Sequence, residues 1–208
     1  FESTRELRQT NLFLRLQVEE RKKAEQKLFY DANHDALTGL ANRQMFLHQL
    51  TQQLILSKRY PQTGMALLFL DLDRFKLIND TLGHHTGDAF LIECAKRLKM
   101  AVREHDLPAR FGGDEFVVML LNLHSPQDAK DVAQRIIDKF RQPYLVHAQS
   151  ISSGVSIGIA PFQTEYMQAD SMLRDADAAM YHAKAQGRDC YVVFQPEMRE
   201  NMLQALQK

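Results

Sequence analysis

The sequence predicts an α+β domain in which helices cover a central, mainly antiparallel sheet of about five strands, with a long helix in front of it. Residues 65–70 are a continuous apolar run of strand length, which is typical of a central strand buried on both faces. Residues 107–120 contain two adjacent glycines between strand-like segments, a pattern that predicts a β-hairpin. Segments with apolar residues at helical spacing separate the strands, so we expect layers of helices on one or both faces of the sheet.

The composition fits one soluble domain with an appendage. Of the 208 residues, 45% are hydrophobic and 25% are charged, and 26 basic side chains balance 26 acidic ones. This balance gives no electrostatic reason to expect nucleic acid as a partner. Cys94 and Cys190 lack metal-ligand spacing, which is typical of a reducing compartment, and no apolar run approaches the roughly 20 residues that span a bilayer. We expect a cytoplasmic domain of a larger protein, because the chain begins at Phe1 rather than Met, and that parent could be anchored in the inner membrane.

Residues 1–32 predict a long solvated helix, because they are mostly polar and contain neither Gly nor Pro. Leu7, Leu14 and Leu28 follow a seven-residue period, and Val18 lies half a period after Leu14, as in a coiled coil. Arg21 and Glu25 occupy the next two positions of this pattern and interrupt it. Two interpretations remain open. The segment is a linker helix, or it is a parallel coiled coil that passes a signal from an upstream sensor domain.

The globular domain is expected over residues 33–196, followed by a helical connector over residues 197–208. Asn42 and the pair Ser125-Pro126 are expected to begin helices. The expected helices span 42–58, a short segment from 75, 88–102, 126–140 and 169–185. Besides the hairpin and the central strand, strands are expected at 144–147, 150–160 and 190–195.

Acidic residues end two of these strands. Asp71 follows the buried run, and Asp114 and Glu115 follow Gly112 and Gly113 at the hairpin tip. Adjacent acids are unfavourable in strands, so a divalent cation or a reacting hydroxyl would explain them. The alternatives are an ordinary solvated turn for the hairpin, and a helix cap or a pair with a neighbouring lysine for Asp71.

Further polar residues surround the glycine-containing turn at 82–87. Asn79, His84 and Asp88 could face one cleft, where a carboxylate and an amide would suit the donor edge of guanine. Turn and N-cap roles are the alternative for each of them. Lys184 and Arg188 are four residues apart around a helix end and could both reach a phosphate, although the helix dipole also explains cations there.

Taken together, these residues resemble the GGDEF diguanylate cyclase family. Five blocks match the family's motifs in order and spacing: Asp35–Arg43, Asp71–Asp80, Gly83–Asp88, Arg110–Phe116 and Ala176–Arg188. The resemblance covers about residues 32–195. It implies the palm-like fold of nucleotidyl cyclases, with the helix of residues 1–32 as a signalling helix. The chain departs from the family at Asp189, where Asn is common.

The resemblance implies condensation of two GTP molecules into cyclic di-GMP with release of two pyrophosphates. It assigns two Mg²⁺ or Mn²⁺ ions per active site to Asp71, the Leu72 carbonyl, Asp114 and Glu115, with Asp114 also the candidate base. The family's substrate-binding positions are matched by Phe75, Lys76, Asn79, His84, Asp88, Gly112, Gly113, Lys184 and Arg188. Since each domain of this family holds one GTP, the resemblance also implies a homodimer.

Arg103 and Asp106 resemble the RxxD site at which the product, cyclic di-GMP, inhibits members of the family. An ion pair at a helix end is the alternative for these two residues. The competing function is a module that binds GTP or cyclic di-GMP without catalysis and regulates an adjacent domain, such as an EAL phosphodiesterase domain that the C-terminal connector would reach.

Overall fold

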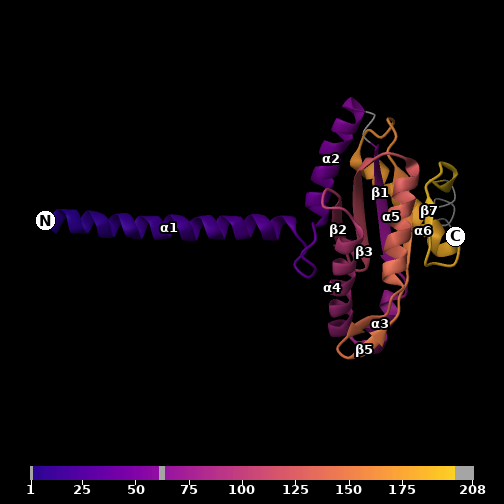
Figure 1. The fold of residues 1–208 in the computed structure, drawn as a ribbon, viewed down its shortest axis with the longest axis horizontal. Coiled ribbons are helices and arrows are strands. Elements are labelled where there is room, and N and C mark those ends of the chain that lie inside the picture. The colour runs from indigo at the N-terminus through magenta and orange to yellow at the C-terminus, as the bar shows by residue number, and fades with distance from the viewer. Residues whose placement is uncertain (1, 61–63, 200–208) are drawn as a thin grey trace.

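The centre of the structure, a computed structural model, is strand β1 (Gly64–Leu72), in which every residue after Gly64 is buried. The structure describes residues 2–60 and 64–199 (Figure 1). The five-stranded sheet has the order β2 (Leu107–Gly112), β3 (Glu115–Leu123), β1, β6 (Val155–Pro161) and β7 (Tyr191–Val193). All neighbours are antiparallel except β6 and β7. The predicted mainly antiparallel five-stranded sheet is confirmed.

Helices cover both faces of this sheet, because β1 alternates between two apolar cores. Leu68, Leu70 and Leu72 belong to one core together with residues of α4 (His84–Ala101) and α5 (Pro126–Phe140). Leu67 and Phe69 belong to the other, with residues of α2 (Arg43–Arg59) and α6 (Ala169–Ala185). Asp71 continues the second series, so its side chain lies on the face that α6 covers. The short helix α3 (Phe75–Leu82) follows β1 directly.

Local chemistry explains where these helices begin. The Asn42 side chain accepts a hydrogen bond from the Met45 N–H at 2.9 Å, which caps α2. Ser125 and Asp128 form a capping box at α5, with Pro126 in its first turn. Helix α4 begins at His84, four residues earlier than expected, because Gly83 at φ +83° turns the chain between α3 and α4.

The strand expected over 150–160 is divided in the structure. Its first residues form β5 (Gln149–Ile151), which pairs with β4 (Tyr144–Val146) in a separate hairpin, and β6 begins at Val155. The tyrosine at the start of this hairpin packs against Phe90 at a ring distance of 4.6 Å. The small hairpin therefore lies against α4, and residues 152–154 separate it from β6.

Helix α1 (Glu2–Asn33) extends away from the sheet and its covering helices (Figure 1). From residue 11 onward its large apolar side chains are at least half exposed: Leu12, Phe13, Leu14, Leu16, Val18, Leu28, Phe29 and Tyr30. Arg21 and Glu25 form an ion pair of 2.8 Å with each other. No helix among the described residues has the length and apolar character needed to cross a membrane. Residues 200–208 of the expected connector lie outside the described residues.

Candidate functional site at the acidic strand ends

The acids of the two predicted strand ends lie beside one another. In the pairing of β1 with β3, Asp71 is directly opposite Glu115. The Leu72 N–H also donates to the Asp114 carbonyl at 3.3 Å, which holds the hairpin turn against the end of β1. The antiparallel sheet therefore brings the pair Asp71 and Leu72 next to the pair Asp114 and Glu115, although the two pairs are more than forty residues apart in sequence.

The hairpin turn leaves open space for another molecule. Gly112 and Gly113 are exposed and have φ angles of +142° and +51°. A Cβ atom added at either position would meet nothing within 4 Å. Glycine is thus favoured here by the backbone conformation, and the free space allows a ligand to approach the backbone closely.

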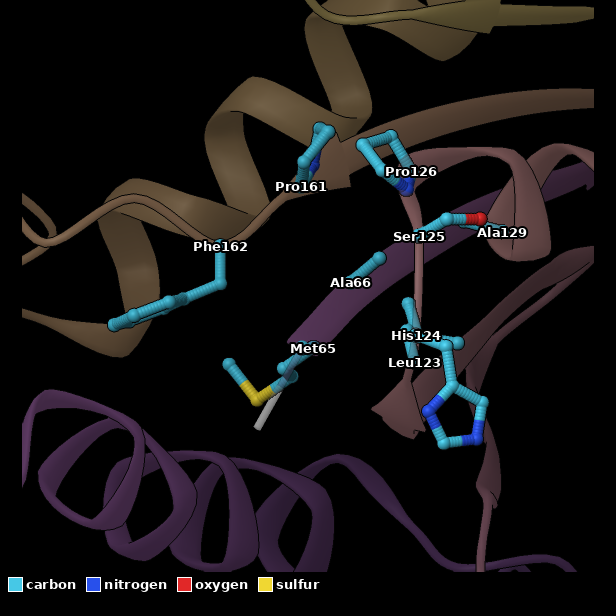
Figure 2. Close-up of a pocket in the computed structure, with 10 residues that line it drawn as sticks. Met65, Ala66, Leu123, His124, Ser125, Pro126, Ala129, Pro161 and Phe162 are labelled. Atoms are coloured by element: carbon cyan, nitrogen blue, oxygen red, sulfur yellow. The ribbon is translucent and has the colours of Figure 1, made fainter. Parts of the chain in front are cut away.

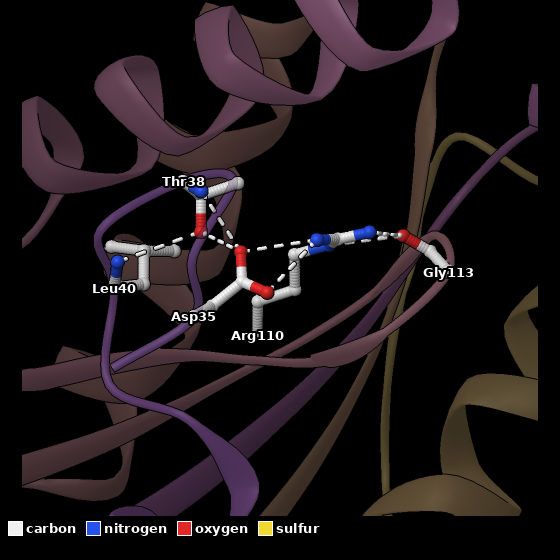
Figure 3. Close-up of polar contacts among 5 residues, drawn as sticks. All are labelled: Asp35, Thr38, Leu40, Arg110 and Gly113. Atoms are coloured by element: carbon white, nitrogen blue, oxygen red, sulfur yellow. Dashed lines mark hydrogen bonds and ion pairs between the residues drawn. The ribbon is translucent and has the colours of Figure 1, made fainter. Parts of the chain in front are cut away.

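Arg110 links this turn to Asp35 (Figure 3). Its Nε and Nη2 atoms donate to the Gly113 carbonyl at 3.1 and 2.9 Å, and its Nη1 atom lies 3.0 Å from both carboxylate oxygens of Asp35. Asp35 also accepts hydrogen bonds from the N–H and the hydroxyl of Thr38. Burial opposes the charge of Asp35, but the hydrogen bonds from Thr38 and Arg110 outweigh it and lower its pKa.

Lys184, at the end of α6, compensates the charge of Asp71. Its Nζ atom lies 2.7 Å from Asp71 Oδ2, whereas Lys76, the pairing partner considered from the sequence, has no ion pair among the described residues. Burial raises the pKa of Asp71 to about 6, with Lys184 opposing the shift and Asp114 adding to it. Burial also raises the pKa of Glu115, and the nearby carboxylates of Asp177 and Asp114 contribute.

This donor set fits a hard divalent cation that is shared with a phosphate ligand. All candidate ligands are oxygens, and burial together with the neighbouring carboxylates raises the pKa values of Asp71 and Glu115. Within the described residues, no three His, Cys, Asp or Glu side chains are arranged to hold a metal ion by themselves. Mg²⁺ is commonly held by one or two carboxylates together with substrate phosphates, so the arrangement suits a cation that binds with a nucleotide.

The predicted guanine-binding residues flank the junction of α3 and α4. The Asn79 side chain lies so close to Gly87 that a Cβ atom there would collide with its oxygen, which places Asn79 beside the first turn of α4. Asp88 follows in that turn, and His84 begins it. Asp88 is therefore inside the helix and does not cap it. Lys76 is exposed on α3, whereas the Phe75 side chain is buried against Phe90, so only the backbone of Phe75 remains for a ligand.

Arg188 lies in the loop after α6, and its guanidinium has no hydrogen bond or ion pair within the described part of the chain. The three residues Gly187, Arg188 and Asp189 all have positive φ angles. The loop is held against the end of β1, since the Asp189 N–H donates to Asp73 Oδ2 at 2.9 Å. Asp73 is buried and also accepts from the Ser156 hydroxyl at 2.7 Å.

Arg103 and Asp106 precede β2 and do not form the ion pair considered from the sequence. Arg103 is exposed, and Asp106 accepts hydrogen bonds from the backbone N–H groups of Arg103 and Leu121 at 2.8 and 3.2 Å. Asp106 is buried and thus fixes the loop. The guanidinium of Arg103 remains available to an anionic or guanine-containing ligand.

A cavity of about 270 Å³ lies at the other end of the sheet (Figure 2). It is lined by the start of β1 at Met65, the end of β3 at Leu123 and the end of β6 at Pro161. Its polar side chains are His124 and Ser125, and the Ser125 hydroxyl already donates to Asp128 of the capping box. The acidic strand ends therefore remain the better candidate site.

The residue-by-residue predictions missed several contributors to this site. Asp177 lies seven residues before Lys184 on α6, a spacing that places both on one face of a helix and could have indicated it. Asp35, Asp73 and Arg110 lie inside the matched blocks but received no role. Arg141, which contacts the loop of Arg188 through Asp189, lies outside every block, and nothing in the sequence indicated it.

Comparisons with known proteins place this chain in a family. Residues 32–190 match the family model described as diguanylate cyclase, GGDEF domain. The chain is 42% identical over 188 residues to the bifunctional diguanylate cyclase/cyclic di-GMP phosphodiesterase MucR of Pseudomonas aeruginosa, which covers 89% of this chain and 27% of MucR. The chain thus spans about a quarter of the length of that relative.

Two solved structures have the same fold. The GGDEF domain of TpbB from Pseudomonas aeruginosa matches with a TM-score of 0.77 and 39% identity, covering 84% of this chain and 99% of that one. The coiled coil and GGDEF domain of DgcB from Caulobacter crescentus, in complex with c-di-GMP, matches with a TM-score of 0.79 and 26% identity, covering 86% and 94%. With the family model matching most of its length and the acidic strand ends in place, the chain belongs to the GGDEF diguanylate cyclase family.

Proposed function

We propose that the chain is a diguanylate cyclase domain that condenses two GTP molecules into cyclic di-GMP and releases two pyrophosphates. The observation that carries the proposal is the meeting of Asp71, Asp114 and Glu115 at two strand ends, beside an open glycine turn and the cation Lys184. Oxygen ligands and a cation around open space suit a metal-bound triphosphate.

In this proposal, the residues of the chain divide the work of phosphoryl transfer. Asn79 and Asp88 hold the guanine edge, with His84 as a further contact, while Lys76, Lys184 and Arg188 bind the triphosphate. Asp114 accepts the proton of the 3′-hydroxyl of one GTP while the hydroxyl oxygen attacks the α-phosphorus of the other GTP. The bond from that phosphorus to the oxygen bridging to the β-phosphate breaks, and pyrophosphate leaves. Two Mg²⁺ or Mn²⁺ ions, bound by Asp71, Asp114, Glu115 and the Leu72 carbonyl, would stabilise the negative charge of the transition state.

Catalysis further requires two chains, because each domain would hold a single GTP. We propose that α1 brings them together as a parallel coiled coil, which would cover its exposed apolar side chains. The ion pair between Arg21 and Glu25 lies within one helix and so does not prevent this association. In the parent protein, an upstream sensor domain would then set how often two domains meet, and a downstream EAL domain is a further candidate partner.

Incubation of the purified chain with GTP and Mg²⁺ at several protein concentrations tests the proposal. We expect cyclic di-GMP, resolved by chromatography, at a rate that rises faster than linearly with protein concentration. An Asp114→Ala chain prepared in the same way controls for contaminating activity. A chain of residues 31–208 should show a lower rate per domain at dilute protein. Tight GTP binding without product at any concentration would favour the regulatory module instead.

We also propose that cyclic di-GMP inhibits the enzyme by binding to Arg103, and that Asp106 positions the loop that carries Arg103. Because the Arg103 side chain makes no hydrogen bond or ion pair with the described residues, Arg103→Ala should leave the initial rate within about twofold and remove most of the inhibition by added product. Initial rates at increasing cyclic di-GMP measure this. Unchanged product sensitivity in Arg103→Ala would contradict the assignment.

A further inference from the structure

Asp189 joins the loop of Arg188 to three other parts of the domain. Its backbone N–H donates to Asp73 Oδ2 at 2.9 Å, next to the end of β1. Arg141, the residue that caps the C-terminus of α5, donates to it twice, with Nε at 2.6 Å from Asp189 Oδ2 and Nη2 at 3.0 Å from the Asp189 carbonyl. The side chain of Asp189 also lies against Gly154, where a Cβ atom would come within 3 Å of it. Three separate segments thus fix the position of one residue.

The loop needs such contacts because its backbone conformation is unfavourable. Arg188 and Asp189 have φ angles of +66° and +49°, which cost non-glycine residues free energy and persist only when surrounding contacts enforce them. The same loop follows Lys184, whose ammonium reaches Asp71. Contacts at Asp189 therefore determine how Arg188 is presented next to the acidic strand ends.

We propose that Arg141 is a positioning residue for the triphosphate site: through its fork onto Asp189 it holds Arg188 in the orientation that binds the nucleotide phosphates. The inference rests on the proposed function, because it assumes that Arg188 contacts the triphosphate. Arg141 itself belongs to the end of α5 and contacts Asp189 and Asp138, so its role is indirect. A guanidinium suits this role, since it can bond a carboxylate and a carbonyl at once, whereas a lysine cannot fork in this way.

Nucleotide affinities measured by calorimetry on the wild-type chain and its variants test the proposal without depending on turnover. Charge-assisted hydrogen bonds contribute enough that Arg141→Gln should weaken GTP binding by about tenfold, while GMP, which lacks the outer phosphates, should bind within about twofold of wild type. Asp138→Asn is the matched control, because it removes the other partner of Arg141 at 3.8 Å and leaves the fork intact. Its GTP affinity should stay within about twofold of wild type.

A double-mutant comparison separates positioning from a general loss of stability. If Arg141 acts through Arg188, Arg141→Gln should change GTP affinity by less than about twofold in a chain that already carries Arg188→Gln. Additive effects, or equal losses for GTP and GMP, would overturn the inference. Arg141→Lys provides the same comparison should Arg141→Gln not fold. If the wild-type chain does not prefer GTP to GMP, the proposed triphosphate contacts fail, and the inference fails with them.

Discussion

Replacing Asp114 by Asn is expected to abolish cyclic di-GMP synthesis while leaving the fold intact. The change keeps the shape of the side chain but removes the charge that would bind a divalent cation and accept the proton of the 3′-hydroxyl. Loss of a general base alone typically lowers rates by about 10²–10⁴-fold, and loss of a metal ligand adds to this. The rate of product formation at saturating GTP and Mg²⁺ is the measurement.

The structure also predicts what the Asp114 substitution should not change. The Asp114 side chain makes no hydrogen bond or ion pair to the described residues, so the free energy of unfolding should stay within about 0.5 kcal/mol of wild type. Asp80→Asn is the matched control, because Asp80 is an exposed acid on α3 that lies in another of the matched blocks. Its activity should remain close to wild type. Synthesis by the Asp114→Asn chain at more than a tenth of the wild-type rate would contradict the role given to Asp114.

Replacing Arg110 by Gln is expected to lower both stability and activity. Arg110 and Asp35 are only 11% and 20% exposed, and removal of Arg110 would leave Asp35 charged and largely buried. Breaking such a pair costs about 3 kcal/mol, which denaturant unfolding would detect. The Gly113 carbonyl would lose both of its hydrogen bonds from Arg110, so the turn that carries Asp114 should become less well positioned.

The matched control for Arg110 is Lys96→Gln. Lys96 and Glu93 form an ion pair on α4 that is 61% and 39% exposed, so its loss should change stability by about 0.5 kcal/mol at most. The difference in the free energy of unfolding between wild type and Arg110→Gln should also depend on pH. The pKa of Asp35 is lowered in the folded state. The charged Asp35 therefore contributes to stability above its unfolded pKa of about 4, and this contribution is lost as the pH falls through its folded-state pKa. An equal difference in the free energy of unfolding at pH 7 and pH 3 would contradict a stabilising ion pair between Arg110 and Asp35.

Much of the architecture could be predicted because local chemistry determines it. The apolar run of β1, the cap at Asn42 and the Ser125-Pro126 start of α5 each act within a few residues, and the structure has all three where they were expected. Two boundaries were wrong for reasons that are not local. Helix α4 begins at His84 because Gly83 turns the chain, and the strand over 150–160 is divided because its first residues pair with β4 and not with the main sheet.

The candidate site shows the same division. The sequence by itself determined the family and the identities of the acids and cations, because these residues stand in motifs whose order and spacing are specific. Only the tertiary structure decided how they meet: the antiparallel register sets Asp71 opposite Glu115, and the end of α6 brings Lys184 to Asp71. It also decided which residues support them, since Arg141 reaches the loop of Arg188 across 48 positions of sequence. Such contacts depend on how helices pack on the sheet, and no local pattern in the sequence encodes that packing.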